Sequence, residues 1–95
     1  MTEITITELG QVAGKLEKLF KTFNIGVKVA TPNIIALTIP KEIKFQDINA
    51  MKEFCYHSLK AAGIELYATL EFIFVSPNGL MSSIILSGTS KGSIN

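Results

Sequence analysis

The stretch from Ile64 to Val75 constrains the fold more than any other part of this 95-residue chain. Its even-numbered positions are all apolar, whereas its odd-numbered positions begin with Glu65, Tyr67, Thr69 and Glu71. A two-residue period is typical of a half-buried strand, because successive side chains of a strand point to opposite faces. We therefore predict a strand over 64–75 with its even-numbered side chains turned toward a core.

A hairpin follows this strand. Ser76-Pro77-Asn78-Gly79 has the composition of a type I turn that ends in a left-handed glycine. Counting outward from the turn pairs Phe72 with Ile84 and Leu70 with Leu86. The other face of the hairpin then carries four apolar side chains: Ile73, Val75, Met81 and Ile85. Since contiguous exposed apolar side chains often mark an interaction surface, we expect self-association there, unless the register is shifted by one residue or another segment covers the face.

Two apolar stripes with three- and four-residue spacing predict two helices. The first stripe consists of Leu9, Val12, Ala13, Leu16, Leu19, Phe20 and Phe23. The second helix is expected from about Phe45 to Ala62, with Ile48, Met51, Phe54, Cys55, Leu59 and Ala62 on its buried face. We expect Asn24 and Gly63 to end the two helices in the left-handed conformation, with Ile64 folding back onto Leu59.

Between the helices, a second hairpin is expected. Ile25, Val27 and Val29 alternate with smaller or charged residues, and Thr31-Pro32-Asn33 separates them from the apolar stretch 34–39. A three-residue loop places Val27 and Val29 on the same face as Ile35 and Leu37. A two-residue loop would instead place Lys28 among the aliphatic side chains, which costs core burial.

The start of the chain leaves two interpretations open. TEITIT over 2–7 alternates like a strand, but Thr5 and Glu8 also have the spacing of a helix capping box. The first interpretation predicts an α+β two-layer sandwich, ferredoxin-like β-α-β-β-α-β with an extra C-terminal hairpin strand. The second predicts duplicated α-β-β units, and the similarity of FKTFNI (20–25) to LKAAGI (59–64) is compatible with it. Either way, residues 1–87 form a single domain and the Gly/Ser-rich residues 88–95 a flexible tail.

Catalytic chemistry has little support in the sequence. One cysteine, Cys55, and one histidine, His57, rule out an internal disulfide and a zinc site made only of Cys and His within this chain. Cys55 falls on the apolar stripe and His57 on the polar side of the second helix, so we do not expect them to act as a nucleophile and base pair. His57 follows Glu53 by four residues, which is best interpreted as a weak surface pair. We expect no catalytic, cofactor-binding or metal-binding residues.

Nucleic-acid binding is the weaker of the binding hypotheses. Six of the nine lysines lie in residues 1–44, and Lys15, Lys18, Lys21 and Lys28 are the candidates for phosphate contacts. The chain has no arginine, the residue that most often reads guanine, and its net charge is only +1. We therefore expect weak nucleic-acid binding at most.

The composition carries one resemblance. Thirteen isoleucines, nine lysines without arginine and five asparagines point to AT-rich coding. In this composition and in its short length, the chain resembles small uncharacterised proteins of archaeal rod-shaped and filamentous viruses. The resemblance rests on no motif, and it implies a viral protein made in the host cytoplasm. A cytoplasmic location is also expected because no apolar run reaches the roughly 18 residues of a membrane span.

These observations favour a non-enzymatic interaction or assembly protein that forms a homodimer through an apolar sheet face or edge. The alternative from another class is a small-molecule-binding regulatory domain of the ACT-like kind, in which the ligand sits at a dimer interface.

Overall fold

The computed structural model describes residues 6–30, 33–65 and 69–87. In chain order, its elements are α1 (Ile6–Phe20), a short 3-10 helix η1 (Lys21–Phe23), β1 (Gly26–Ala30), β2 (Ile34–Thr38), α2 (Ile48–Ala61), β3 (Leu70–Val75) and β4 (Met81–Leu86). Each α-helix is thus followed by a β-hairpin. The described chain has the order of two α-β-β units.

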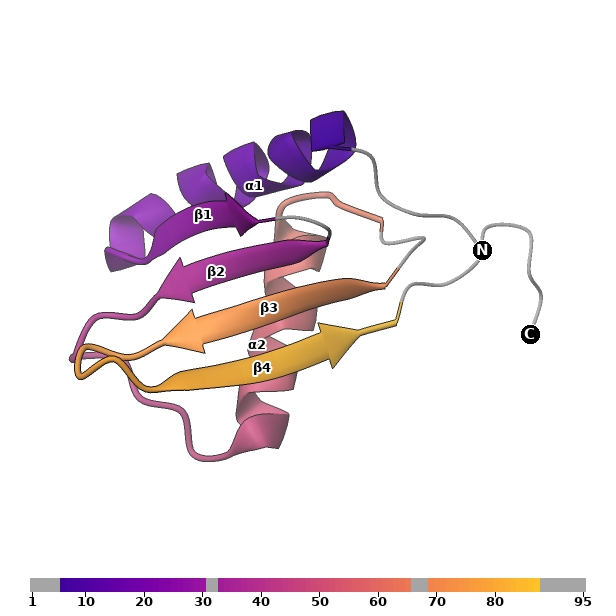
Figure 1. Cartoon of the computed structure of the whole chain (residues 1–95). Coiled ribbons are helices and arrows are strands. Elements are labelled where there is room, and N and C mark those ends of the chain that lie inside the picture. The colour runs from indigo at the N-terminus through magenta and orange to yellow at the C-terminus, as the bar shows by residue number, and fades with distance from the viewer. Residues whose placement is uncertain (1–5, 31–32, 66–68, 88–95) are drawn as a thin grey trace.

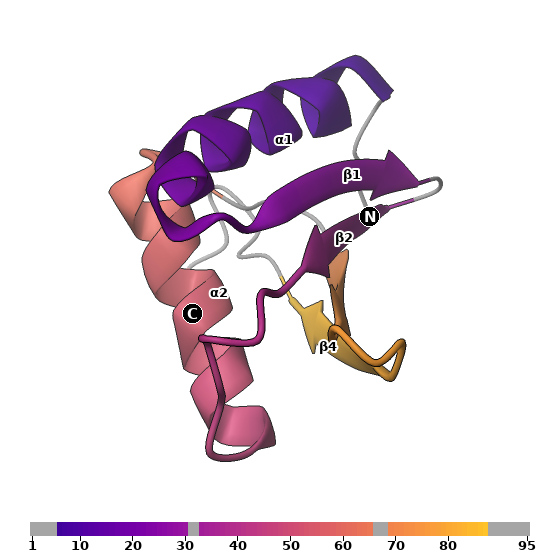
Figure 2. The same cartoon turned by 90° about the vertical axis from the view of Figure 1, so that its left-hand side faces the viewer.

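The four strands form one mixed sheet in the order β1-β2-β3-β4 (Figure 1). Both hairpins are antiparallel, whereas β2 and β3 run parallel and are joined through α2. α2 lies behind the sheet in Figure 1, and α1 runs along the β1 edge, as the rotated view in Figure 2 also shows. The protein is therefore an α+β fold whose helices leave the other face of the sheet uncovered by any described element.

The ferredoxin-like strand order is not confirmed. That topology needs a strand at 2–7, but Ile6 and Thr7 belong to α1 and residues 2–5 lie outside the described residues. A split β-α-β arrangement also separates its parallel strands by a further strand. Here β2 and β3 are direct neighbours, with Ile34 opposite Glu71 and Thr38 opposite Val75. The described elements match the alternative of successive α-β-β units.

Both predicted hairpin registers are confirmed. In the first hairpin Val29 lies opposite Ile35 and Val27 opposite Leu37, the pairing that a three-residue loop requires. In the second hairpin Phe72 lies opposite Ile84 and Leu70 opposite Leu86.

The turn of the second hairpin also has the predicted local structure. The Gly79 amide donates to the Ser76 carbonyl over 2.9 Å, and Gly79 has a φ of +90°. The Ser76 amide in turn donates to the Leu80 carbonyl over 2.8 Å. Local turn chemistry therefore fixes which hairpin side chains face the helices.

The ends of the helices follow the predicted local signals. Asn24 has a φ of +60° after η1, and the Ile25 amide donates to the Phe20 carbonyl over 3.3 Å. At the end of α2, Gly63 has a φ of +74°, and the Ile64 amide donates to the Leu59 carbonyl over 2.9 Å. This second arrangement is a Schellman motif, which supplies partners for helix carbonyls that would otherwise lack them.

Two apolar residues assigned to buried helix faces are exposed instead. Phe23 is 52% exposed because α1 ends at Phe20 and η1 changes the angular spacing of the side chains that follow. Ile48 is 54% exposed because α2 begins at this residue rather than at Phe45. Asp47 is the N-cap of α2, and its carboxylate accepts a 2.9 Å hydrogen bond from the Ala50 amide.

The strand predicted over 64–75 is shorter in the structure. β3 begins at Leu70, whereas Ile64 and Glu65 are not in a strand and 66–68 lie outside the described residues. β2 begins opposite Glu71 and β4 ends opposite Leu70, so among the described residues the pairing of β3 with its neighbours begins at Leu70.

The core lies between the helices and the inner sheet face. α1 contributes Leu9, Leu16 and Phe20, α2 contributes Cys55 and Leu59, and the sheet contributes Ile35, Leu37, Leu70, Phe72, Phe74, Ile84 and Leu86. Since the helices cover this face, every alternate strand residue is left on the outer face.

Candidate functional site

The strand registers define the outer face of the sheet as three rows of four residues, one from each strand. The rows are Ala30-Ile34-Glu71-Ile85, Lys28-Ala36-Ile73-Ser83 and Gly26-Thr38-Val75-Met81. Only two of these residues, Lys28 and Glu71, carry a charge. In Figure 1 this face is turned toward the viewer, and no described element stands in front of it. We refer to these residues as the outer face.

The four predicted self-association residues all lie on the outer face. Met81 and Ile85 are 69% and 58% exposed, and Ile73 and Val75 are half-buried by their neighbours on the adjacent strands. The predicted parity of the hairpin is therefore confirmed. Side chains as exposed as those of Met81 and Ile85 are removed from water only when another molecule or segment packs against the outer face.

The two charged residues of the outer face lie in opposite halves of the sheet. Lys28 is exposed on the edge strand β1, and Glu71 is half-buried on β3. The Ser83 hydroxyl on β4 donates a 2.5 Å hydrogen bond to a Glu71 carboxylate oxygen. This bond fixes the carboxylate beside Ser83, toward the β4 edge.

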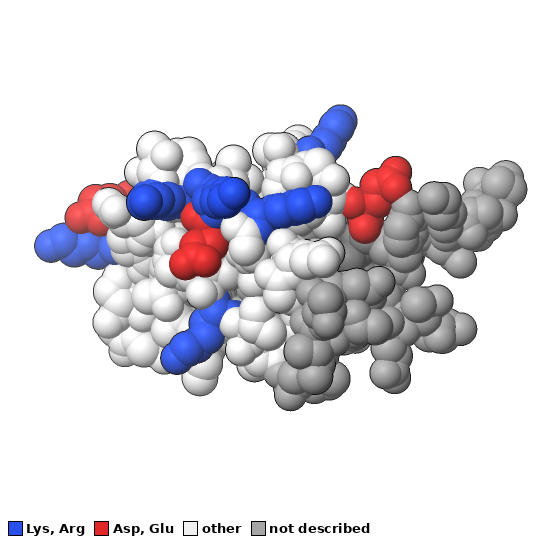
Figure 3. Space-filling view, turned by 90° about the horizontal axis from the view of Figure 1, so that it is seen from above, with Lys and Arg blue, Asp and Glu red and all other residues white. Residues whose placement is uncertain are grey.

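The candidate lysines for nucleic-acid binding do not share one element. Lys15, Lys18 and Lys21 are exposed on α1 and η1, whereas Lys28 belongs to the outer face. Figure 3 shows lysine side chains in a row over the top of the molecule, with acidic side chains among them. Glu17, exposed between Lys15 and Lys18, reduces the positive charge of this region.

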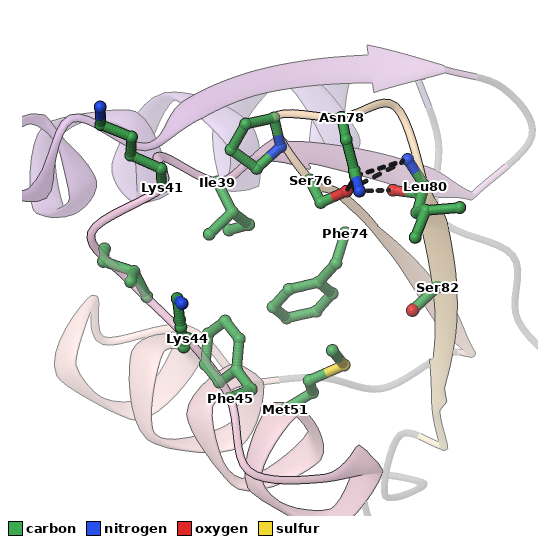
Figure 4. Close-up of a pocket in the computed structure, with 12 residues that line it drawn as sticks. Ile39, Lys41, Lys44, Phe45, Met51, Phe74, Ser76, Asn78, Leu80 and Ser82 are labelled. Atoms are coloured by element: carbon green, nitrogen blue, oxygen red, sulfur yellow. Dashed lines mark hydrogen bonds between the residues drawn. The ribbon is translucent and has the colours of Figure 1, made fainter.

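A cavity of about 550 Å³ lies at the end of the sheet where β2 ends and the second hairpin turns (Figure 4). The segment between β2 and α2 forms one wall, with Ile39, Lys41, Lys44 and Phe45. The hairpin forms the opposite wall. Sequence reasoning missed this cavity because its walls come from segments that are far apart in the chain, and no local pattern marks such a place.

Aromatic side chains form the floor of the cavity. Phe45 meets Phe74 edge to face, with ring centroids 5.2 Å apart and planes at 88°. Phe74 is almost fully buried, and Phe45 and Met51 are half-buried beside it. Phe45 precedes α2 instead of lying within it, which is why its ring folds back over the sheet end.

The single cysteine is buried, whereas the single histidine is exposed. Cys55 is fully buried in the core, and burial raises the pKa of its thiol from 9.0 to about 12. A thiol with that pKa is protonated at neutral pH and is a poor nucleophile. His57 and Glu53 are both exposed on α2. Within the described residues, no three His, Cys, Asp or Glu side chains are grouped so that they could hold a metal ion.

Across residues 6–30, 33–65 and 69–87, no helix has the length and apolar character that a membrane-spanning helix requires. The chain matches no protein-family model, no curated protein and no solved structure.

Proposed function

We propose that this chain is a non-enzymatic assembly protein that forms a symmetric homodimer by packing the outer faces of two copies against each other. The supporting observation is the distribution of side-chain size on that face. The half formed by β1 and β2 carries the small residues Gly26, Ala30 and Ala36 beside Lys28, Ile34 and Thr38. The half formed by β3 and β4 carries the large residues Ile73, Met81 and Ile85 beside Glu71, Val75 and Ser83.

This distribution favours a second copy of the same chain as the partner. A two-fold axis that runs along the strands between β2 and β3 places β1 of one copy over β4 of the other. Met81 then lies over Gly26, and Ile85 lies over Ala30. At these two edge positions large side chains meet small ones in both directions, because an interface with two-fold symmetry makes each contact twice. Between them, Ile34 of one copy lies over Glu71 of the other.

The charges of the outer face support the same axis. With this axis, Lys28 of one copy lies over Ser83 of the other, next to the carboxylate that Ser83 holds. An axis perpendicular to the strands would instead bring the two copies of Lys28 together, which repel each other. The position of Lys28 therefore favours the axis along the strands.

The size of the face indicates the strength of this dimer. Four strands about 4.8 Å apart, each about five residues long at about 3.3 Å per residue, make a face of roughly 300 Å² before side-chain relief is counted. Stable interfaces bury about 800 Å² on each partner. We therefore expect a reversible dimer whose population depends on concentration in the micromolar to millimolar range.

Sedimentation equilibrium of matched variants tests the proposal. Ile85→Glu places a second carboxylate opposite Glu71 on the outer face. Ile48→Glu is the control, because Ile48 is an equally exposed isoleucine, 54% against 58%, at the start of α2. We expect the wild type and Ile48→Glu to dimerise alike and Ile85→Glu to stay monomeric. A monomeric wild type, or an Ile85→Glu variant that dimerises like the wild type, contradicts the proposal.

Nucleic-acid binding by Lys15, Lys18, Lys21 and Lys28 is the competing function. Of these four candidates, the proposed dimer covers Lys28 and leaves the three on α1 and η1 exposed. Retention of the wild type on mixed-sequence DNA or RNA at low salt, lost in Lys18→Ala/Lys21→Ala, would favour this function instead.

A further inference from the structure

The cavity at the sheet end differs from the outer face in shape and in chemistry. It is concave, and its volume of about 550 Å³ lies within the range of roughly 300–1,000 Å³ that is typical of small-molecule sites. Its walls are the 39–45 segment, α2 and the second hairpin, so it lies within one copy of the chain. A ligand there does not need the proposed dimer.

The interior of the cavity suits an apolar body. Figure 4 shows Phe74 in the middle, with Phe45 and Met51 on one side and Ile39 on another. Leu80, on the rim, is 69% exposed. An alkyl chain or a ring placed against Phe74 would remove these apolar surfaces from water, at about 25 cal/mol for each Å² that is buried.

Two lysines stand at the opening of the cavity. Lys41 and Lys44 are both exposed and both line the cavity, and they lie on the same side of it in Figure 4. No carboxylate is among the lining residues that the structure describes. The nearby Asp47 carboxylate is occupied as the cap of α2. Because lysine stems are flexible, both ammonium groups can turn toward an anion at the opening.

The wall opposite the lysines carries the polar side chain of Ser82. Ser82 is on β4, in the row of inner-face residues that also contains Phe74 and Leu37. Its hydroxyl points into the cavity in Figure 4, and it makes no hydrogen bond to the described residues. In the neighbouring turn, by contrast, the Ser76 hydroxyl donates to the Asn78 side-chain oxygen and accepts from the Leu80 amide.

From this arrangement we infer that the cavity binds an amphipathic organic carboxylate. Its apolar body lies against Phe45, Phe74 and Met51, and its carboxylate lies at the opening within reach of Lys41 and Lys44. The apolar walls supply affinity, and the two ammonium groups select an anionic head over a neutral or cationic one.

Three probes with the same alkyl chain test the inference: octanoate, octanol and octylammonium. Titration of the full chain, followed by calorimetry and by NMR shifts of residues around the cavity, gives a dissociation constant for each. We expect octanoate to bind about tenfold more tightly than octanol, as two partly screened lysine contacts would provide. We expect octylammonium to bind more weakly than octanol.

Variants separate the two parts of the site. Lys41→Ala/Lys44→Ala should weaken octanoate binding about tenfold and leave octanol binding unchanged. Ser82→Leu adds an apolar side chain to an apolar face and should fill the cavity, so binding of all three probes is lost while the circular dichroism spectrum of the fold is kept. The matched control Lys18→Ala/Lys21→Ala should bind octanoate like the wild type.

Several results would overturn the inference: no binding of octanoate, equal binding of octanoate and octylammonium, or unchanged octanoate binding in Lys41→Ala/Lys44→Ala or Ser82→Leu. The titrations are repeated with Ile85→Glu, which we expect to be monomeric. Octanoate binding to that variant supports the cavity site whether or not the wild type dimerises.

Discussion

Phe20 of α1 stacks on Phe54 of α2, with ring centroids 5.3 Å apart and planes at 16°. Phe54 also meets Phe45 and Phe74 edge to face, at centroid distances of 5.2 and 6.2 Å. One side chain on α2 thus touches the first helix, the segment before its own helix and the inner face of the sheet. The packing of both helices against the sheet depends on this ring.

Removing that ring should destabilise the whole domain. We expect Phe54→Ala to lower the free energy of unfolding by about 2–3 kcal/mol, because it removes the ring contacts of a half-buried side chain on three sides. Tyr56→Ala is the control on the same helix, since Tyr56 is 42% exposed, and it should change the free energy by no more than about 0.5 kcal/mol. Urea unfolding of the two variants measures the difference, and equal effects would contradict the assigned packing.

Replacing two glycines with alanine should change the stability of the protein in opposite directions. Gly63 has a φ of +74°, which alanine adopts at a cost, so Gly63→Ala should destabilise the protein by about 1 kcal/mol. Gly10 lies inside α1 with nothing within 4 Å of an added Cβ, so Gly10→Ala should stabilise it by about 0.5–1 kcal/mol. Thermal unfolding gives both signs, and destabilisation by both substitutions would disagree with this account.

The contrast between these glycines also explains what the sequence could predict. Features that depend on near neighbours in the chain are predicted correctly. They are the helix ends at Asn24 and Gly63 and the hairpin turn at Gly79, and that turn also determines the register of β3 and β4. Hydrogen bonds between near neighbours in the chain determine each of these. The exposure of Met81 and Ile85 followed from the register.

Features that depend on distant segments could not be predicted in the same way. The start of β3 depends on where β2 begins, and nothing in the alternation of 64–75 contains that information. Phe45 continues the helical spacing of α2 but packs outside the helix against Phe74. The cavity arises from the same packing, so it too has no signal in the local sequence.

The buried cysteine should be chemically protected by the fold. Cys55 is fully buried and its thiol pKa is about 12, so almost none of it is thiolate at pH 8. We expect iodoacetamide to leave the native protein unmodified on the time scale on which it modifies the chain in denaturant, as mass spectrometry would show. Equal rates would mean that the thiol is accessible in the native state.

The same thiol should make stability fall at high pH. Well below pH 9 it is protonated in both the folded and the unfolded chain and adds no pH dependence. Between pH 9 and about 12 the unfolded chain releases the proton while the folded chain keeps it, so the free energy of unfolding decreases as pH rises. Urea unfolding between pH 8 and about 10.5 should show a smaller decrease for Cys55→Ala than for the wild type. Parallel curves would exclude this contribution from Cys55.

Charge reversal on the outer face should test the orientation of the proposed dimer. Lys28→Glu and Glu71→Lys should each weaken dimerisation, because each places like charges near each other across the proposed two-fold axis. The double variant Lys28→Glu/Glu71→Lys restores opposite charges and should dimerise more strongly than either single variant. Dissociation constants from sedimentation give the coupling energy, and purely additive effects would rule out a contact between the two positions.

The proposed contact between Met81 of one copy and Gly26 of the other tests the central claim most directly. These residues lie on opposite edges of one sheet, about 14 Å apart across three strand spacings, so no short contact joins them within one copy. In a concentrated sample that mixes isotope-labelled and unlabelled chains, we predict intermolecular NOEs from the Met81 methyl group to Gly26 and from Ile85 to Ala30. A dimeric sample with no intermolecular NOEs from Met81 or Ile85 would contradict assembly through the outer face.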